Sequence, residues 1–286
     1  MKSDFLVGVS LGVGQVNAIL CDGDFNILER ESRPFAPKMG KESIATKIEK
    51  TITSLPSFHK AAAVAVAAPA IFDQTNKLIK SSSIDELLGA NLYQLLSKKI
   101  DLPLFITRRS FCLMLAEQAF GQAKGRKNAV VVEIGKDIDC AFEINGKIFR
   151  GATGSSGQIS STIVDITREK RSSVGSFGSL VSGEGISALT GKSVYQILKE
   201  NPKSDLVSKQ IIRDLKDSLL TGLLNIKLML DPEIFIITGD ILENFNLFKG
   251  AFYDLGVEVF PSELGRDGAA LGAAITAYNG IEKIGK

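Results

Sequence analysis

An internal repeat constrains the fold of this chain more than any other feature of its sequence. The segment VSLGVGQVNAILCDG (Val9 to Gly23) aligns without gaps with VEIGKDIDCAFEING (Val132 to Gly146). Each segment has an apolar stretch ending at a glycine, a polar interval, a second apolar stretch, and an Asp-Gly or Asn-Gly pair at the same offset. Because such pairs between apolar runs are the strongest short hairpin signals, the repeat predicts two copies of one strand-rich unit.

The order of elements after each hairpin is also the same. In the first half, an amphipathic helix over Lys41–Leu55 precedes a buried strand over Ala61–Ile71. In the second half, a long helical pattern over Asp205–Leu230 precedes a buried strand over Glu233–Gly239. Strands that come together and then alternate with helices, twice, indicate an α/β fold made of two similar domains.

Composition excludes several classes of partner. The 286 residues are 44% hydrophobic and 23% charged, which suits one large or two medium domains. A net charge of +2, with short basic clusters that lack interleaved aromatic residues, argues against a nucleic-acid partner. The longest apolar run, Ala61–Phe72, is shorter than the ~20 residues of a membrane span, and the first residues have no signal-peptide organisation. We therefore expect a cytoplasmic protein without a membrane partner.

The cysteines and the histidine bear on disulfides and metals. Cys21, Cys112 and Cys140 lie in apolar patterns, and their odd number indicates reduced thiols rather than a disulfide framework. His59 is the single histidine, and the sequence has no CxxC pair. These residues argue against a zinc site with nitrogen and sulfur ligands, so we expect no metal.

Two glycine-bearing hairpins that face a common cleft can hold phosphate oxygens from both sides. This architecture resembles the actin-like ATPase (ribonuclease H-like) fold, with duplicated βββαβα domains and a cleft between them. The specific resemblance is to the ROK family of repressors and sugar kinases. Two segments carry it: Asn225–Leu242, with a helix, Asp-Pro-Glu, an apolar strand and a glycine, and Leu264–Tyr278, which is similar to the family's closing helix.

The resemblance also implies how the chain is divided. It predicts an N-terminal actin-like subdomain over residues 1–112 and a C-terminal one over residues 113–286. The final helix, at about residues 267–280, is expected to pack back on the N-terminal subdomain.

The catalytic position departs from the family pattern. Active members carry Glu-Asn-Asp before a helix, and the matching positions here read Thr107, Arg108 and Arg109. In the family kinases this aspartate accepts the proton of the attacking sugar hydroxyl. Arg109 cannot do so, because a guanidinium stays protonated in proteins. The resemblance therefore implies no catalytic residue, with Arg109 in the place of the aspartate.

Both phosphate hairpins depart from the pattern as well. The first, Asp-x-Gly-Gly-Thr-Lys in the family, begins here with Ser10, and the second, Gly-Thr-Gly-x-Gly-Gly, carries Asp137 and Asp139. Carboxylates in a phosphate cradle repel the ligand, and we expect them to pair with Arg108 or Arg109. The nucleotide contacts that the resemblance still implies are Gly12, Gly14, Gln15, Gly135, Lys136 and Gly239.

The sugar-binding segment is altered in the same way. The family's Gly-Glu-x-Gly-His appears here as GQISS, Gly157 to Ser161, which lacks the carboxylate and the histidine zinc ligand. The cysteine-rich zinc loop of many members corresponds to Ser172–Ser179, which has no cysteine. The resemblance therefore implies sugar contacts from Arg108, Gln158 and Ser161, and no bound zinc.

These departures predict a protein with a sugar-kinase fold that is catalytically inactive or strongly impaired, and that binds a sugar, a nucleotide or a protein partner. ATP with Mg²⁺ is the one cofactor to be considered, and a homodimer is the expected assembly. The alternative is an active ATP-dependent sugar kinase in which Asp137, Asp139 or Asp101 supplies the missing carboxylate. A DNA-binding repressor is disfavoured, because the first strand begins near Phe5 and leaves no room for a helix-turn-helix before it.

Most site residues have a purely structural alternative. The hairpin glycines are equally consistent with turns or bulges alone. Asp137 and Asp139 suit solvated or paired carboxylates, and Gln158 suits loop capping.

Overall fold

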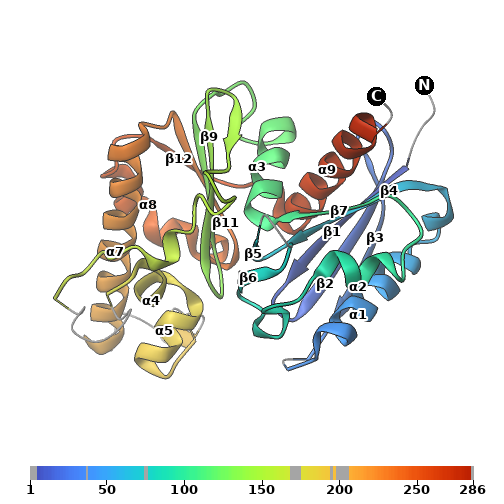
Figure 1. The fold of residues 1–286 in the computed structure, drawn as a ribbon. Helices are drawn as coiled ribbons and strands as arrows, with labels where there is room; N and C mark the ends of the chain where they lie inside the picture. The colour runs from blue at the N-terminus through green and yellow to red at the C-terminus, as the bar shows by residue number, and fades with distance from the viewer. Residues whose placement is uncertain are drawn as a thin grey trace. The chain divides into compact units, whose positions relative to one another are not determined.

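The computed structural model describes residues 5–36, 38–73, 77–167, 175–193, 196–197 and 206–284. The chain forms two compact units (Figure 1). Unit 1 consists of Met1–Lys124, Arg150–Ser156 and Glu263–Lys286, and unit 2 consists of Gly125–Phe149 and Gly157–Ser262. This division falls after residue 124, and it assigns a short loop and the C-terminal segment to unit 1.

Unit 1 is built on a five-stranded mixed sheet with the order β3-β2-β1-β4-β7. The strands are β1 Phe5–Gly12, β2 Gln15–Cys21, β3 Ile27–Pro34, β4 Ala61–Ala68 and β7 Leu104–Arg108. The first three are antiparallel to their neighbours, and β4 and β7 join in parallel. The helices are α1 Lys41–Thr53, α2 Leu92–Ser97, α3 Arg109–Phe120 and α9 Gly268–Ile284.

Helices cover both faces of this sheet. On one face, α1 buries Ile44, Ile48 and Ile52 in the core, as its helical periodicity predicts. On the other face, α9 packs against β1, β4 and α3. Gly8 of β1 permits this close approach, since a Cβ atom there would overlap the Ala270 carbonyl of α9. The β1 and β4 strands are therefore buried on both sides, as their nearly continuous apolar sequences require.

Unit 2 has a sheet of the same order, β10-β9-β8-β11-β12. Its strands are β8 Ala129–Ile134, β9 Ile138–Ile144, β10 Lys147–Phe149, β11 Ile234–Thr238 and β12 Glu258–Pro261. The helices include α4 Phe177–Val181, α5 Gly183–Thr190, α7 Leu206–Leu230 and α8 Phe245–Tyr253, and η3 Ile159–Ser161 is a short 3₁₀ turn. The matching sheet orders confirm the repeat that the sequence predicts.

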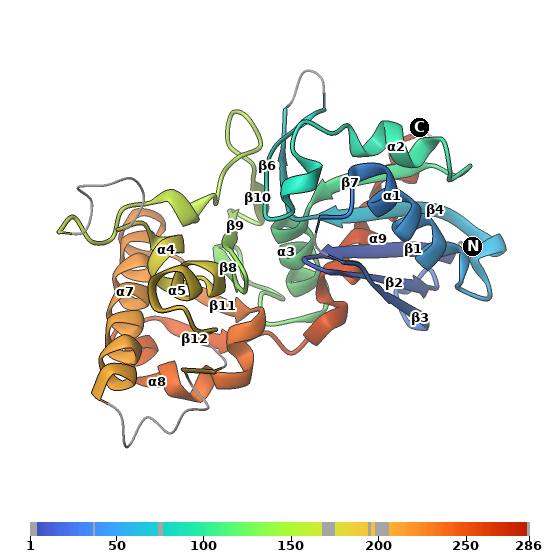
Figure 2. The ribbon, with the colours of Figure 1, turned by 90° about the horizontal axis from the view of Figure 1, so that it is seen from below.

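The core of unit 2 lies between its sheet and α7, with α4 and α8 against that helix (Figure 2). Leu215, Leu219, Leu223 and Ile226 of α7 are buried there, as their spacing predicts. The Phe177 ring of α4 sits where a Cβ atom on Gly222 of α7 would be. Phe177 is therefore part of the core of unit 2.

The expected strand over Ala61–Ile71 is wrong in one respect. It is two strands, β4 and β5 Ala70–Phe72, separated at Pro69. Proline has no N–H to donate to a sheet, so the ladder ends there. The β5 strand pairs instead with β6 Ile79–Ser82 in a two-stranded sheet. Within the described part of the chain, no helix is long and apolar enough to cross a membrane.

Candidate functional site

The hairpin that opens unit 1 is a tight two-residue turn. Val13 and Gly14 join β1 to β2, and Gly12 pairs with Gln15 across the turn. Gly14 has a φ of 82°, a left-handed conformation that suits glycine. The side-chain amide of Gln15 donates to Ser32 Oγ of β3, 2.5 Å away. Gln15 is therefore directed along the sheet, and the backbone of the turn remains the group suited to a phosphate.

Ser10 and Arg109 meet at the carboxyl edge of the unit 1 sheet. Ser10 lies near the end of β1 and is fully buried, and Arg109 is the first residue of α3, directly after β7. The Arg109 guanidinium donates a hydrogen bond to Ser10 Oγ. The family resemblance expects carboxylates at both positions, for proton transfer and near the metal. This pair does not fit a Mg²⁺ site, because the guanidinium repels a metal cation and neither side chain supplies a carboxylate.

Arg108 is buried, with 3% of its surface exposed, and it organises a second contact in unit 1. Its guanidinium donates to the Ser156 carbonyl and lies 5.3 Å from the centre of the Phe111 ring. Arg150 approaches the same ring, at 4.7 Å. The loop between Arg150 and Ser156 is closed by a hydrogen bond from the Ser156 N–H to the Arg150 carbonyl. Three arginines thus gather at the first turn of α3.

The charges at the first turn of α3 also act on the thiol of Cys112. Burial raises the pKa of the Cys112 thiol from 9.0 to about 12. Smaller effects from the Thr276 hydroxyl and from the Arg109 and Arg150 guanidinium groups lower it. The thiol is therefore protonated and inert at neutral pH, although two cations lie close enough to act on it.

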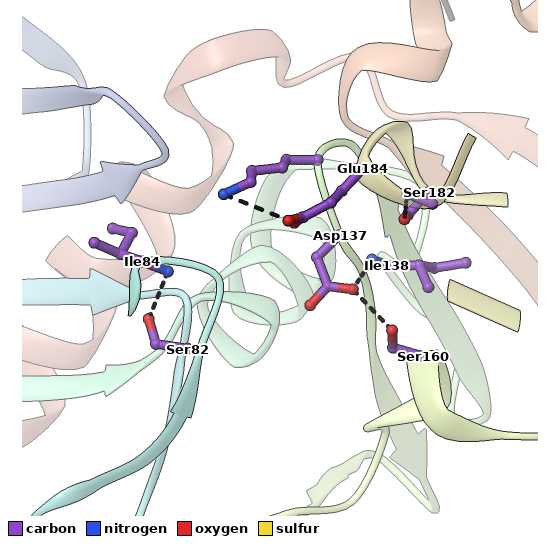
Figure 3. Close-up of polar contacts among 9 residues, drawn as sticks. Ser82, Ile84, Asp137, Ile138, Ser160, Ser182 and Glu184 are labelled. Carbon is purple, nitrogen blue, oxygen red and sulfur yellow. Dashed lines mark hydrogen bonds and ion pairs between the residues drawn. The ribbon is translucent and has the colours of Figure 1, made fainter. Parts of the chain in front are cut away.

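The corresponding hairpin of unit 2 is one residue longer and is filled by its own carboxylate (Figure 3). Asp137 accepts hydrogen bonds from the Ile138 N–H at 2.7 Å and from the Ser160 hydroxyl at 2.8 Å. The Gly135 N–H donates to the Asp137 carbonyl at 3.0 Å. N–H groups of such a loop are the donors that hold phosphate oxygens. Here two of them bind Asp137, so the loop does not fit a nucleotide phosphate as it stands.

The start of α5 closes the other side of this loop. The N–H groups of Gly183 and Glu184 donate to the carbonyls of Gly135 and Lys136, at 2.7 and 3.0 Å. The Lys136 ammonium pairs with the Glu184 carboxylate at 3.7 Å, and both side chains are substantially exposed. Lys136 and Gly135 therefore lie together as expected, but an α5 segment that the sequence did not mark also contacts them.

Gly239 lies beside the same loop, at the end of β11. Its φ is 92°, and a Cβ atom there would meet the Ile134 carbonyl at 2.5 Å. A side chain on Gly135 would meet the Asp240 carboxylate at 3.4 Å. Unit 2 therefore brings Gly135, Lys136 and Gly239 together at the carboxyl edge of β8 and β11.

Gln158 precedes the η3 turn and Ser161 is its last residue, and both are exposed. Gly157 before them has a φ of 81°, and a Cβ atom there would overlap the Cys140 carbonyl. Between them, Ser160 ties the turn to Asp137. The sequence did not identify Ser160 or Arg150 as site residues: Ser160 stands at a glycine position of the family's sugar-binding segment, and Arg150 lies outside the motifs.

The expected pairing of Arg108 or Arg109 with Asp137 or Asp139 stays a prediction, because the arginines belong to unit 1 and the aspartates to unit 2. The start of the expected zinc loop, residues 172–174, lies outside the described residues. Among the described residues, no group of three or more histidine, cysteine, aspartate or glutamate side chains is arranged to hold a metal ion.

With the geometry established, comparison with known proteins decides the family. The ROK family model matches residues 6–278. The chain belongs to the ROK family. The xylose repressor of Bacillus subtilis is 25% identical, over 95% of this chain and 76% of the repressor. The glucokinase of Thermotoga maritima is 24% identical, over 94% of this chain and 96% of that enzyme.

A solved structure of the family gives the fold. The ROK family glucokinase from Streptomyces griseus, in complex with glucose and AMPPNP, superimposes with a TM-score of 0.81 at 18% identity, over 96% of this chain and 99% of that chain. This likeness confirms the actin-like ATPase fold that the repeat and the motifs predict. ROK relatives thus include both sugar kinases and transcriptional repressors.

Proposed function

We propose that this ROK protein binds a carbohydrate and does not phosphorylate it. The observation that carries the proposal is the hydrogen bond from Arg109 to Ser10 at the carboxyl edge of the unit 1 sheet. Phosphoryl transfer to a sugar needs a group that accepts the proton of the attacking hydroxyl and cations that neutralise the phosphates. A permanent cation in the place of the base cannot accept that proton, and Ser10 offers no negative charge to a metal ion.

The hairpin of unit 2 supports the same proposal. Its Asp137 carboxylate accepts the Ile138 N–H that a phosphate oxygen would otherwise engage. A nucleotide would have to displace that carboxylate and tolerate its charge, which weakens ATP binding. Phosphate binding through Gly12, Gly14, Gln15, Gly135, Lys136 and Gly239 is accordingly a minor part of the proposed function.

Carbohydrate binding is supported by the η3 turn and by the names of the relatives. Gln158 and Ser161 present exposed hydrogen-bonding side chains, and the hydrogen bond from Ser160 to Asp137 holds the turn that contains them. A xylose repressor among the relatives supports a role in which a sugar is bound rather than converted. We extend the proposal to a homodimer in the cytoplasm, which sedimentation analysis and fractionation would test.

The second candidate is an ATP-dependent sugar kinase with unorthodox residues. The Thermotoga maritima glucokinase, matched over nearly its whole length, favours it. In that case Asp137 or Asp139 would have to provide the proton acceptor.

A coupled kinase assay with a paired variant tests the proposal. Wild-type protein is expected to give no sugar-dependent ADP release with pentoses, hexoses and N-acetylhexosamines in the presence of Mg²⁺. A turnover on the order of 1 s⁻¹, ordinary for a kinase, would favour the second candidate. In parallel, calorimetry should detect binding of at least one of these sugars to the wild-type protein. The double variant Ser10→Asp/Arg109→Asp is assayed in the same way for ADP release, to show whether carboxylates at both positions restore turnover.

A further inference from the structure

Three arginine side chains lie at the first turn of α3. Arg109 begins the helix, Arg108 precedes it, and Arg150 packs on the ring of Phe111. The N-terminus of a twelve-residue helix adds a further partial positive charge. A neutral sugar gains little from such a potential, whereas an anion is drawn to it.

The three arginines differ in exposure, and this gives them different roles. Arg108 is buried and fixes the Ser156 carbonyl, so it holds the loop that begins with Arg150. Arg109 is half-buried, and Arg150 is exposed. Arg108 is therefore a positioning residue, while Arg109 and Arg150 are the side chains placed to reach a bound molecule.

A buried hydroxyl group adds a second sign of a ligand at this turn. Ser110 Oγ, beside Arg109, is fully buried and has no hydrogen-bond partner among the described residues. Buried polar groups in native proteins are nearly always hydrogen-bonded to protein, water or ligand. The first turn of α3 thus combines guanidinium groups with a buried hydroxyl that lacks a hydrogen-bond partner among the described residues.

From this geometry we infer that the carbohydrate ligand of the protein carries an oxyanion, a carboxylate or a phosphate, held by Arg109 and Arg150 at the N-terminus of α3. The inference rests on the proposed function and narrows its ligand class. Planar guanidinium groups match both oxyanions through paired hydrogen bonds, which an ammonium group does not. Arg109, which in the proposed function cannot accept the sugar's proton, thereby becomes one of the two groups that select the ligand.

Calorimetry with matched sugars tests this inference. Each neutral sugar of a panel of pentoses and hexoses is compared with its sugar acid and its sugar phosphate, and with inorganic phosphate alone. We expect one acid or phosphate to bind at least about tenfold more tightly than its neutral parent, as one charged hydrogen-bonded contact provides. Its affinity should fall between about 0.02 M and about 0.2 M salt, while that of any neutral sugar stays constant.

Two variants locate the effect. Arg150→Gln, at an exposed position where folding is retained, should weaken the anionic sugar about tenfold and leave neutral-sugar affinity within about twofold. The control, Arg30→Gln, removes another exposed arginine of unit 1, one that pairs with Asp267, and should change neither affinity. Arg109→Gln should act like Arg150→Gln.

Three results would overturn the inference. They are a neutral sugar that binds as tightly as its anionic forms, inorganic phosphate that binds as tightly as the sugar phosphate, and a panel in which no anionic sugar binds. The first leaves the proposed function intact, since a sugar still binds. Phosphorylation of a bound sugar would instead contradict the proposed function.

Discussion

The hairpins that open the sheets of unit 1 and unit 2 occupy equivalent places and differ in how their polar groups are used. In unit 1, a two-residue turn joins the strands, and Gly12 pairs with Gln15 as in an ordinary hairpin. In unit 2, the three-residue turn folds the Asp137 carboxylate back onto Ile138 and onto Ser160. The two segments have the same length, so the longer turn of unit 2 arises because its strands stop pairing at Ile134 and Ile138, and the Asp137 carboxylate fills the loop that results.

The charges at the two sheet edges differ as well. Unit 1 places Arg109 against Ser10 at the carboxyl edge of its sheet, and unit 2 places Asp137 in its hairpin. Kinase chemistry would need other groups at both places: a carboxylate instead of the arginine in unit 1, and uncharged donors instead of the carboxylate in unit 2. The two units therefore share their sheet order and buried strands but differ in the charged groups at their strand ends.

The largest effect is expected where unit 1 departs from unit 2 in packing. Gly8 of β1 corresponds to Val131 of β8 in the repeat, and it contacts α9 so closely that a Cβ atom would overlap the Ala270 carbonyl. Gly8→Val should lower the free energy of unfolding by about 3 kcal/mol, measured by denaturant titration, because backbone and not a flexible side chain is in the way.

Gly250→Ala in α8 is the matched control for that substitution. Nothing lies within 4 Å of a Cβ atom at Gly250, which sits inside a helix. Alanine there should raise stability by about 0.5 to 1 kcal/mol, by restricting the unfolded chain. A Gly8→Val protein as stable as wild type would show that α9 does not pack on β1 as described.

Alkaline pH should lower the stability of unit 1 through the buried thiol of Cys112. Burial raises the pKa of Cys112 from 9.0 to about 12, so the unfolded chain loses this proton first as pH rises. The contribution of Cys112 to the free energy of unfolding is therefore fully present below pH 9 and is lost between pH 9 and 12. Relative to Cys112→Ala, wild-type protein should lose about 1.4 kcal/mol between pH 8 and pH 10.

A thiol reagent gives an independent check on the same group. Native protein at pH 8 should react slowly at Cys21 and Cys112, which are both buried with pKa values raised to about 12. Unfolded protein should react at all three cysteines. Rapid labelling of Cys112 in the native state would show that water reaches the contact between α3 and α9.

The effect of opening the unit 2 hairpin should be smaller. Asp137→Ala removes the acceptor for Ile138 and Ser160, which should cost about 1 kcal/mol of stability. It also frees a donor and removes a negative charge, so ATP affinity measured by calorimetry should rise about tenfold. Asp137→Asn keeps an acceptor oxygen and should remain close to wild type in stability. Unchanged ATP affinity in the alanine variant would mean that the carboxylate does not exclude phosphate.

The smallest effect concerns the contact between this hairpin and α5. Lys136 and Glu184 form an exposed pair at 3.7 Å, and the α5 start is held mainly by backbone hydrogen bonds to the loop. Glu184→Gln should change stability by about 0.3 kcal/mol or less, as is usual for exposed ion pairs. A loss above about 1 kcal/mol would show that the pair, and not the backbone, holds α5.

Sequence alone predicted the parts of this protein that depend on local patterns. The periodicity of α1 and α7 and the apolar run of β11 gave elements within two residues of their observed ends. The site depends on contacts between distant residues: Arg109 binds Ser10, 99 positions away, and Asp137 binds Ser160, 23 positions away. No periodicity encodes such a pair, so the motifs identified Arg109 and Asp137 as unusual but not the partners of their side chains.

The most direct test of the account is a single-turnover experiment. Protein in excess over radiolabelled ATP is mixed with Mg²⁺ and with each sugar that binds in calorimetry, so that even a very slow transfer would be recorded. We expect no labelled sugar phosphate above a protein-free blank, because in the proposed function Arg109 stands in the place of the proton acceptor. Transfer of the label to sugar in an amount matching the bound ATP would contradict it.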